Sequence, residues 1–244
     1  MDKEKVVLIT GGAKRIGSYI ARYFHAKGFN IILHFNSSAK EAEQLKSDLL
    51  SIRKNSCRTI QANFSDESSF KQALKEILDS TERLDVLINN ASGFFPTPIE
   101  SATKEQWLTL LDTNATVPLL LIKALRPLLE DSKGCVINIS DSEVSSGIPE
   151  YSLYAAAKAA LESLTKSLAK ELAPHIRINA IAPGIILWPE KGVLDEKKKA
   201  EIVNKTALGR DGEPDDIASA AYLLYRSTYM TGQVLKIDGG RSPG

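Results

Sequence analysis

Short runs of apolar, often β-branched residues alternate with longer segments of helical periodicity along the whole of this chain. The apolar runs occupy residues 6–9, 31–33, 58–62, 86–88, 136–139, 176–181 and 233–237. Several of them are unbroken stretches of Val, Ile and Leu, which is typical of parallel strands buried on both faces. An alternation of strands and helices predicts repeated βαβ units. We therefore expect an α/β fold: one doubly wound domain over residues 1–244, with helices on both faces of a parallel sheet.

The composition excludes several functional classes. The chain has 244 residues, of which 43% are hydrophobic and 25% charged, and these proportions exclude disordered, collagen-like and disulfide-dependent chains. Its 31 Lys and Arg residues against 30 Asp and Glu residues leave a net charge of +1, so no electrostatic field favours nucleic acid or anionic lipid. The densest basic run, residues 197–199, adjoins acidic residues and indicates a solvated helix face. We predict a small-molecule partner and no nucleic-acid partner.

The cysteines and the apolar runs bear on location. Cys57 and Cys135 lie in apolar segments without the spacing of metal ligands, so we expect buried thiols, a reducing compartment and no metal site. The apolar stretch that follows residues 1–5 is too short for a signal peptide, and no apolar run approaches the length of a membrane span. The sequence therefore predicts a cytoplasmic location and no membrane partner.

Residues 188–210 interrupt the alternation of strands and helices. Pro189, Gly192 and Gly209 surround a charged block at residues 195–201. A loop of this length inside a compact domain is usually functional, so we predict that this segment is a lid over a binding site.

A glycine-rich turn follows the first apolar run, with the sequence Thr-Gly-Gly-Ala-Lys-Arg-Ile-Gly at residues 10–17. Such a turn between a strand and a helix brings backbone N–H groups and the helix dipole to a pyrophosphate. Arg15 stands where the usual pattern has a third glycine, so a fixed cation replaces a small residue there.

The end of the second apolar run bears on the choice of cofactor. His34, Asn36, Ser37 and Ser38 lie there, with no carboxylate to accept from the ribose 2′-hydroxyl of NAD. Hydroxyl groups at this strand end and the cations of the glycine-rich turn can instead donate to a 2′-phosphate, which favours NADPH. In the alternative interpretation the cations point into solvent and the neutral strand end accepts either cofactor.

Tyr154 and Lys158 are four residues apart in a strongly helical segment, so both project from one helix face. A cation beside a phenol favours the phenolate and lowers the pKa of the tyrosine, which makes it a usable acid or base. The pair follows a strand run late in the chain, near the sheet edge where doubly wound folds bind ligands.

These motifs together resemble the short-chain dehydrogenase/reductase family over essentially the whole length. Residues 10–17 are similar to its cofactor turn, residues 89–92 to its Asn-Asn-Ala-Gly strand end, and Asn114 to its helix asparagine. Tyr154 and Lys158 resemble its catalytic pair, and Pro183 with Gly184 its nicotinamide loop. The resemblance implies a Rossmann-type sheet of seven parallel strands, a nicotinamide cofactor and a homotetramer. The cofactor half would cover about 1–140, and the catalytic and substrate-loop half about 141–244.

One departure from the family pattern concerns its catalytic serine, which normally lies 13 residues before the tyrosine. Asp141 occupies that position here, flanked by Ser140 and Ser142, either of which is a candidate for a slipped serine. A carboxylate opposes the effect of the lysine and raises the pKa of the Tyr154 phenol, so the proton stays available for donation. That arrangement suits reduction of a C=N bond, although Ser-Asp-Ser is also ordinary turn chemistry.

The pteridine reductases are the branch that combines this aspartate with Arg15 and an Asn-Ala-Ser-x-Phe segment, present here at residues 90–94. Residues 186–190 are similar to the substrate loop of the bacterial members. By resemblance, Phe94 stacks on the pterin, Arg15 bridges cofactor phosphates and substrate, and Ser92 hydrogen-bonds the pterin. We expect Phe94 and Phe95 to line the cavity rather than the core. Stacking has its own warrant, because a flat heterocycle between two π systems gains contact area.

Three positions leave the details open. Trp188 is either a substrate contact or a cap on the core. Asn63 stands where the wider family has an aspartate near the adenine, and residues 36–37 stand where many NADP-using relatives place an arginine.

The prediction is an NADPH-dependent pteridine reductase that gives tetrahydropterin or tetrahydrofolate. The predicted catalytic residues are Asp141, Tyr154, Lys158 and Asn114. The predicted cofactor contacts are Gly11, Lys14, Arg15, Ile16, Gly17, His34, Asn36, Ser37, Ser38, Asn63, Asn90, Ala91, Ser92, Tyr154, Lys158, Pro183 and Gly184. The predicted substrate contacts are Arg15, Ser92, Phe94, Asp141, Tyr154 and Trp188. Two alternatives stay open: a reductase of 3-oxoacyl thioesters or other ketones, and a non-catalytic NADP(H)-binding sensor.

Overall fold

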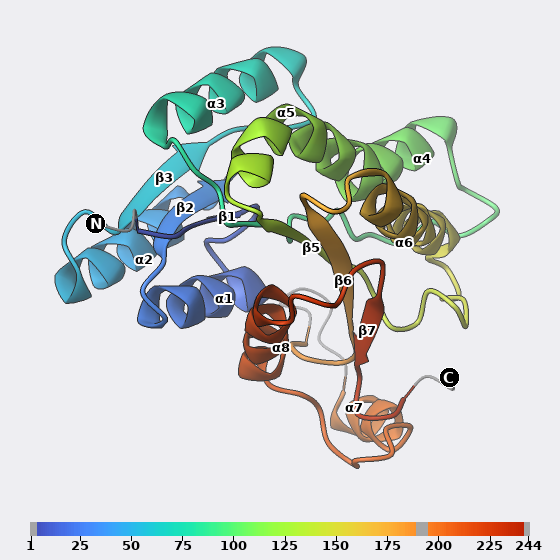
Figure 1. Ribbon diagram of the computed structural model, residues 1–244. Coiled ribbons are helices and arrows are strands. Elements are labelled where there is room, and N and C mark those ends of the chain that lie inside the picture. Colours follow the sequence, from blue (N-terminus) through green and yellow to red (C-terminus); the bar gives the residue numbers. More distant parts are fainter. Residues whose placement is uncertain (1–3, 189–194, 242–244) are drawn as a thin grey trace.

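The computed structural model describes residues 4–188 and 195–241. Within these residues, seven strands form one parallel sheet in the order β3-β2-β1-β4-β5-β6-β7 (Figure 1). The strands are β1 (Val6–Ile9), β2 (Asn30–Phe35), β3 (Cys57–Gln61), β4 (Val86–Asn89), β5 (Cys135–Ile139), β6 (Arg177–Pro183) and β7 (Val234–Ile237). Each corresponds to one of the apolar runs, so the predicted doubly wound sheet of seven parallel strands is confirmed.

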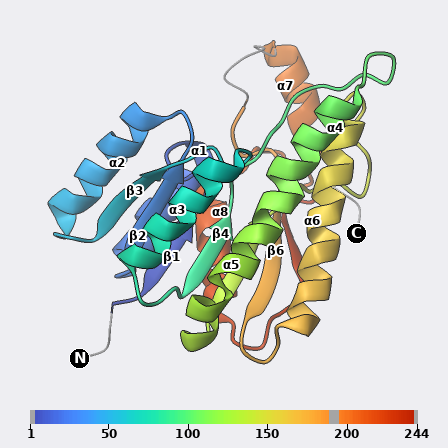
Figure 2. The same ribbon diagram turned by 90° about the horizontal axis from the view of Figure 1, so that it is seen from above.

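Helices cover both faces of the sheet, as predicted (Figures 1 and 2). The helices are α1 (Arg15–Ala26), α2 (Ala39–Ile52), α3 (Glu67–Ser80), α4 (Lys104–Leu111), α5 (Val117–Asp131), α6 (Ser152–Glu171), α7 (Glu196–Val203) and α8 (Pro214–Arg226). Ile20 and Phe24 of α1 belong to a core cluster that also contains buried residues of α2 and α8. Leu125 and Leu129 of α5 belong to a second cluster with α3 and the end of α6. The sheet is thus buried on both faces, because apolar residues alternate toward each of the two clusters.

The predicted lid is not one continuous loop. The Asp195 carboxylate accepts a hydrogen bond of 2.7 Å from the backbone N–H of Lys198, and this N-cap begins α7. Figure 1 shows α7 beyond the carboxyl end of β7. The charged block therefore forms a solvated helix, as its composition indicated, while Pro189 and Gly192 lie outside the described residues.

The expectation that no apolar segment approaches the length of a membrane span needs correction. Lys104–Asp131 is a helical stretch of 28 residues that is long and apolar enough to cross a membrane by length and composition alone. A short π-helical turn, Asp112–Thr116, joins α4 to α5 within it. Leu121, Leu125 and Leu129 recur at helical spacing and are buried in the core. The apolarity of this stretch therefore belongs to a face that covers the sheet in this fold.

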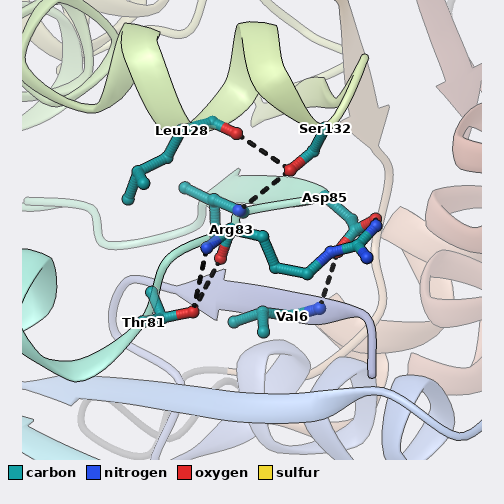
Figure 3. A network of polar contacts seen from close by, with 7 residues as sticks. Val6, Thr81, Arg83, Asp85, Leu128 and Ser132 are labelled. Atoms are coloured by element: carbon teal, nitrogen blue, oxygen red, sulfur yellow. Dashed lines mark hydrogen bonds and ion pairs between the residues drawn. The ribbon is translucent and has the colours of Figure 1, made fainter. Parts of the chain in front are cut away.

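A polar network closes the amino edge of the sheet beside β1 and β4 (Figure 3). Asp85 is buried, and its carboxylate accepts 3.0 and 2.6 Å hydrogen bonds from the Arg83 guanidinium and a 2.8 Å bond from the backbone N–H of Val6. Ser132 accepts from the backbone N–H of Leu84 and donates to Leu128, which ties the end of α5 to the same edge. Every oxygen of the Asp85 carboxylate therefore has a donor.

From β1 the chain adds β2 and β3 on one side, and it then adds β4 to β7 on the other side. The order of the strands therefore reverses between β1 and β4. Ligands of doubly wound folds bind outside the carboxyl ends of the strands at such a switch point. The carboxyl ends of β1, β4, β5 and β6 lie at one edge because these strands are parallel neighbours. This edge is where the predicted site residues gather.

Candidate active site

The glycine-rich turn after β1 has no room for side chains at its key positions. Gly11 has a φ of +59°, and a Cβ added there would lie 3.0 Å from the Cα of Ala91. A Cβ on Gly17 would lie 2.6 Å from the carbonyl oxygen of Gly11. The Asn90 amide donates to the carbonyls of Thr10 and Gly11 at 3.0 and 2.9 Å. The end of β4 therefore holds the turn in place, with the first N–H groups of α1 facing outward as an anion cradle.

Arg15 adopts a φ of +51°, the left-handed conformation that favours glycine. Its backbone thus keeps the geometry of the glycine it replaces. The guanidinium donates to the carbonyl oxygens of Leu187 at 2.9 Å and Trp188 at 3.1 Å. Arg15 therefore links the glycine-rich turn to the predicted substrate loop and does not reach toward the end of β2.

The end of β2 is less neutral than the sequence indicated. Lys14 forms an ion pair with Glu41 at 2.8 Å, and both side chains are exposed. Glu41 belongs to the first turn of α2, so a carboxylate lies one turn beyond the strand end, where the local sequence showed none. Asn36 and Ser37 are exposed and Ser38 precedes α2, its carbonyl accepting from Ala42. Lys14 is the predicted 2′-phosphate contact that lies beside this strand end.

His34 faces away from the predicted cofactor cradle. Its ring is buried and stacks on Phe64 with centroids 3.8 Å apart. Nδ1 accepts from the N–H of Gly11 at 3.3 Å, while Nε2 is 3.0 Å from the carbonyl oxygen of Ala62. These partners assign the proton to Nε2, and burial lowers the pKa of His34 to about 4, so the ring stays neutral. His34 supports the turn from behind and is not placed to contact a ligand through its side chain.

Two further predicted cofactor contacts are engaged within the protein. The Asn63 side chain accepts from the backbone N–H of Ser65 at 3.1 Å and so shapes the turn before α3. Ile16 packs against the core beside α1. These positions border the cradle, with Asn63 at the carboxyl end of β3.

Asp141 and Tyr154 meet at the carboxyl end of β5. The Tyr154 hydroxyl donates to one oxygen of the Asp141 carboxylate at 3.0 Å, and the backbone N–H of Glu143 donates to the other at 2.9 Å. Burial raises the pKa of Asp141, against the effect of these hydrogen bonds and of Lys158. Burial and the Asp141 carboxylate together raise the pKa of Tyr154 well above 10. The predicted lowering by Lys158 is therefore wrong, because desolvation and the carboxylate outweigh it, whereas the predicted raising by Asp141 is confirmed.

Lys158 lies one turn along α6 from Tyr154, as its spacing predicted. Its ammonium donates to the carbonyl oxygen of Ile139 at 2.7 Å and lies 5.9 Å from the centroid of the Tyr154 ring. Burial lowers the pKa of Lys158 to about 8, although Asp141 and Glu162 raise it. Glu162, one further turn along α6, was missed in the sequence.

Neither flanking serine takes the place of the family's serine. The Ser140 hydroxyl donates to the Glu162 carboxylate at 2.7 Å. The Ser142 hydroxyl is buried and has no hydrogen-bond partner within the described part of the chain. Since Asp141 alone of these three contacts Tyr154, the aspartate and not a slipped serine occupies that position.

Asn114 lies in the π-helical turn between α4 and α5 and is fully buried. Its amide donates to the carbonyls of Gly93 at 3.0 Å and Leu110 at 2.9 Å, and its oxygen accepts from the Ser92 hydroxyl at 2.7 Å. Single π-turns inside helices recur at functional sites. Here the turn presents Asn114 to the segment that follows β4, so Asn114 and Ser92 are brought together as predicted neighbours of one site.

A family model described as enoyl-(acyl carrier protein) reductase matches residues 11–242. The chain belongs to the short-chain dehydrogenase/reductase family. It is 31% identical over 282 residues to pteridine reductase 1 of Leishmania tarentolae, covering 97% of this chain and 96% of that protein. It is 32% identical over 244 residues to the 3-oxoacyl-(acyl-carrier-protein) reductase FabG of Staphylococcus aureus, covering 98% and 99%. The family model confirms the predicted family. Because the two identities are nearly equal, the comparisons do not single out the pteridine branch.

In this short-chain dehydrogenase/reductase, the ring of Phe94 lies beside Tyr154 and Tyr151. Phe94 is 53% exposed. Its ring stacks on Tyr151 at 4.5 Å and meets Tyr154 edge-on at 4.8 Å. Phe95 is partly buried and packs against the small core cluster of Leu110, Tyr154 and Ala157, and its predicted place in the cavity lining stays a prediction. Tyr151 was missed, although it lies one helical turn before Tyr154.

Trp188 is half-buried and held by two charged residues. Its indole N–H donates to the Asp211 carboxylate at 3.2 Å, and the Lys199 ammonium lies 5.9 Å from its ring centroid. Asp211 also lines a cavity of about 400 Å³ beside the carboxyl ends of β6 and β7. Pro189 and Glu190 of the predicted substrate loop lie outside the described residues. Trp188 is therefore fixed between α7, the segment before α8 and the Arg15 side chain.

The predicted nicotinamide loop begins where β6 ends. The carbonyl oxygen of Pro183 accepts from the N–H of Ser142 at 3.0 Å, next to Asp141. A Cβ on Gly184 would lie 2.6 Å from the Cα of Asp238, so the residue after β7 requires a glycine there. This close approach brings the Pro183–Gly184 segment beside the Asp141 loop.

Proposed function

We propose that this chain is an NADPH-dependent pteridine reductase that reduces dihydropterin or dihydrofolate to the tetrahydro form. The observation that carries the proposal is the 3.0 Å hydrogen bond from the Tyr154 hydroxyl to the Asp141 carboxylate. A ketone reductase of this family uses a serine at that position, which carries no charge. A carboxylate beside the phenol keeps the phenolic proton in place at neutral pH, because it raises the pKa of Tyr154.

The cofactor cradle supports the choice of a nicotinamide dinucleotide. A Cβ at Gly11 or Gly17 would lie too close to Ala91 or to Asn90, so the glycines let the turn pack against the end of β4 and place the N-terminus of α1 where a pyrophosphate would bind. Asn90, Ala91, Pro183 and Gly184 would complete the cradle. NADPH would supply a hydride from its nicotinamide ring. Lys14 supports the phosphorylated cofactor because it lies beside the end of β2, where a 2′-phosphate would bind.

The protein's own groups supply the proton. Reduction of a C=N bond adds hydride to carbon and a proton to nitrogen, and Tyr154 is the donor we assign to that nitrogen. Asp141 fixes the phenol by accepting its hydrogen bond and would offset positive charge on a protonated ring. Lys158 would hold the nicotinamide ribose. Asn114 would position Ser92 and the water that returns a proton to Tyr154.

The mouth of the site supports a flat substrate. Phe94 is half-exposed and already belongs to an aromatic stack with Tyr151, and a pterin extends such a stack with a large contact area. Arg15 and Trp188 would close the site from the side of the substrate loop, because the Arg15 side chain already holds that backbone. We further propose that the enzyme works as a cytoplasmic homotetramer, in keeping with its family resemblance.

The second candidate is a 3-oxoacyl thioester reductase, and its support is the 32% identity to the FabG of Staphylococcus aureus. In that candidate Asp141 would have to be dispensable, since Ser140 is bonded to Glu162 and Ser142 is buried. The non-catalytic sensor is less well supported, because Tyr154, Lys158 and Asn114 all retain reactive or positioning contacts.

The test measures NADPH oxidation by the purified enzyme with dihydrobiopterin, dihydrofolate and a 3-oxoacyl thioester. We expect turnover of a pterin or folate, and we expect Asp141→Ser to lower that kcat/KM by roughly 10²- to 10⁴-fold, the range for loss of a positioned acid–base group. Ser140→Ala is the matched control, because it removes a neighbouring hydroxyl that does not contact Tyr154. Turnover of the thioester alone, little affected by Asp141→Ser, would refute the pterin proposal. Tight NADPH binding without turnover of any substrate would favour the sensor.

A further inference from the structure

A pair of charged residues behind Asp141 connects three segments that are far apart in the sequence. The Arg241 guanidinium donates to one oxygen of the Glu143 carboxylate through Nε at 3.2 Å and Nη2 at 2.8 Å. Its remaining nitrogen, Nη1, donates to the carbonyl oxygen of Ile202 at 3.4 Å. Glu143 belongs to the loop after β5, Ile202 to the last turn of α7, and Arg241 to the turn after β7. We call this arrangement the Glu143–Arg241 pair.

The pair contacts Asp141 through the backbone. Each oxygen of the Asp141 carboxylate has one hydrogen bond, from the Tyr154 hydroxyl and from the backbone N–H of Glu143. The position of Glu143 thus sets one of the two contacts that orient the carboxylate. Its carbonyl also accepts from the N–H groups of Ser146 and Gly147 at 3.0 Å each, so the same residue organises the rest of the loop.

The Arg241 side chain is well placed to hold this position. It is only 12% exposed, against 37% for Glu143, so the ion pair is partly shielded from solvent and from salt. The turn before it is tight: Gly239 and Gly240 have φ values of +64° and +75°, and the N–H of Gly240 donates to the Asp238 side chain. A guanidinium beside the last carbonyls of α7 also complements the negative end of that helix.

We propose that Glu143 and Arg241 are positioning residues that hold the Asp141 carboxylate on Tyr154 and tie it to the end of α7. The role of Asp141 in this inference rests on the function proposed above. Arg241 supplies the countercharge for Glu143. Lys158, the other cation near Asp141, lies beside Tyr154. The Arg241 side chain also connects α7, which carries the Lys199 contact to Trp188, with the loop that carries Asp141.

The charges around Asp141 give the pair a signature in the pH profile. Tyr154 and Lys158 face Asp141 from α6, Glu143 lies on its own loop, and Arg241 lies behind Glu143 on the turn after β7. The Glu143 charge raises the pKa of Asp141. Removing Arg241 leaves that charge uncompensated and raises the pKa of Asp141 further, whereas Glu143→Gln removes it and lowers the pKa. The two substitutions therefore shift the acid side of the activity profile in opposite directions.

The experiment compares Arg241→Ala, Arg241→Lys, Glu143→Gln and the double variant Glu143→Gln with Arg241→Ala. The readouts are kcat and kcat/KM as functions of pH with NADPH and dihydrobiopterin, together with thermal unfolding. We expect Arg241→Ala to lower kcat roughly tenfold, because small displacements of a catalytic group cost rate, with the KM for NADPH unchanged. The acid side should move to higher pH in Arg241→Ala and to lower pH in Glu143→Gln, and Arg241→Lys should recover part of the rate.

The double variant tests whether the two residues act as one unit. If they do, adding Arg241→Ala to Glu143→Gln should cause little further loss, since its partner is already gone. Arg22→Ala is the matched control, because it removes an exposed ion pair with Asp48 that joins α1 to α2. Losses that multiply in the double variant, with no opposite movement of the acid side, would overturn the proposal and leave Arg241 a stabilising residue of the tail. If Arg241→Ala does not fold, Arg241→Lys and Glu143→Gln carry the same comparison.

Failure of this inference is distinct from failure of the proposed function. If the wild-type enzyme reduces only the thioester, the pterin proposal fails, and the pH profiles are measured with the thioester. Opposite shifts there still support the pair, because its contacts with the Asp141 loop do not depend on the substrate. If pterin is reduced and the pH profiles of all variants coincide, the positioning role of the Glu143–Arg241 pair is overturned and the proposed function stands.

Discussion

Two aspartates at opposite ends of the strands, Asp85 buried and Asp141 partly buried, show how the same side chain is used for stability and for chemistry. Asp85, before β4, accepts from the Arg83 guanidinium in a fork and from the N–H of Val6. Asp141, after β5, accepts from one phenol and one backbone N–H. The nearest ammonium, on Lys158, donates to a backbone carbonyl instead. The ion-paired Asp85 carboxylate stabilises the amino ends of the strands. The Asp141 carboxylate accepts from the Tyr154 phenol at the carboxyl ends, where we propose that the reaction takes place.

The largest effect is expected at the amino edge. Asp85→Ala should lower the free energy of unfolding by about 3–5 kcal/mol, because it leaves the Arg83 charge and the Val6 N–H without their buried partner. The kcat per folded molecule should not change, since the edge lies at the other end of the strands from Tyr154. Chemical denaturation monitored by circular dichroism, with kinetics on the same samples, measures both quantities.

A matched control for that experiment is Asp48→Ala, which breaks the exposed ion pair with Arg22. Exposed pairs contribute little, so its denaturation midpoint should stay close to that of the wild type. An equal loss of stability in both variants would contradict the distinction between the two kinds of pair. A loss of kcat in Asp85→Ala would contradict the separation of the two edges.

The second prediction concerns the charge that Tyr154 feels. Asp141→Asn keeps the shape of the side chain and removes its negative charge, so the raised pKa of Tyr154 should fall toward 10. Lys158, with a pKa of about 8, is mostly neutral in the alkaline range where the phenol titrates. The ultraviolet absorbance of phenolate, followed from neutral to alkaline pH, measures the shift.

The Tyr154→Phe variant identifies the relevant step in this titration, because the absorbance change that disappears belongs to Tyr154. A Tyr154 step at the same pH in wild type and Asp141→Asn would mean that burial alone controls the phenol. The carboxylate would then give no reason to prefer C=N reduction over ketone reduction.

The fold was largely predictable because its signals are local. Buried parallel strands have continuous apolar runs, and aspartate is a typical N-cap residue, as Asp66 is at the start of α3, where it accepts from the N–H of Ser69. The basic run 197–199 indicated a solvated helix face, but the bounds of α7 were not predicted, because glycine and proline around it indicated a loop. Its own cap, Asp195, was already present in the sequence. In the helical stretch Lys104–Asp131 we looked for uninterrupted apolar runs and did not consider its mean hydropathy. Its length and apolar composition were therefore missed.

The centre of the site was predictable from strand ends and helical spacing. Asp141 follows β5, and Tyr154 and Lys158 share one face of α6, so parallel topology brings them together. Glu41, Glu162, Asp211 and Arg241 were missed, because charged residues are common on surfaces and their partners are set by the tertiary fold. Arg15 was predicted as a contact of both cofactor and substrate, and its guanidinium contacts carbonyl oxygens of the substrate loop.

The smallest effect is expected at the exposed Lys14–Glu41 ion pair, a third setting for a carboxylate. Glu41→Gln removes the carboxylate that competes with a 2′-phosphate for Lys14 and should raise the preference for NADPH over NADH, measured as the ratio of kcat/KM values, roughly two- to fivefold. Lys14→Gln should lower that ratio, and both effects should weaken as salt is added. Glu43→Gln is the matched control, because Glu43 lies on the same helix as Glu41 but pairs with Lys46 and accepts from Thr59 of β3. A ratio that falls in Glu41→Gln would mean that the carboxylate itself serves the cofactor, and NADPH would lose its best structural support.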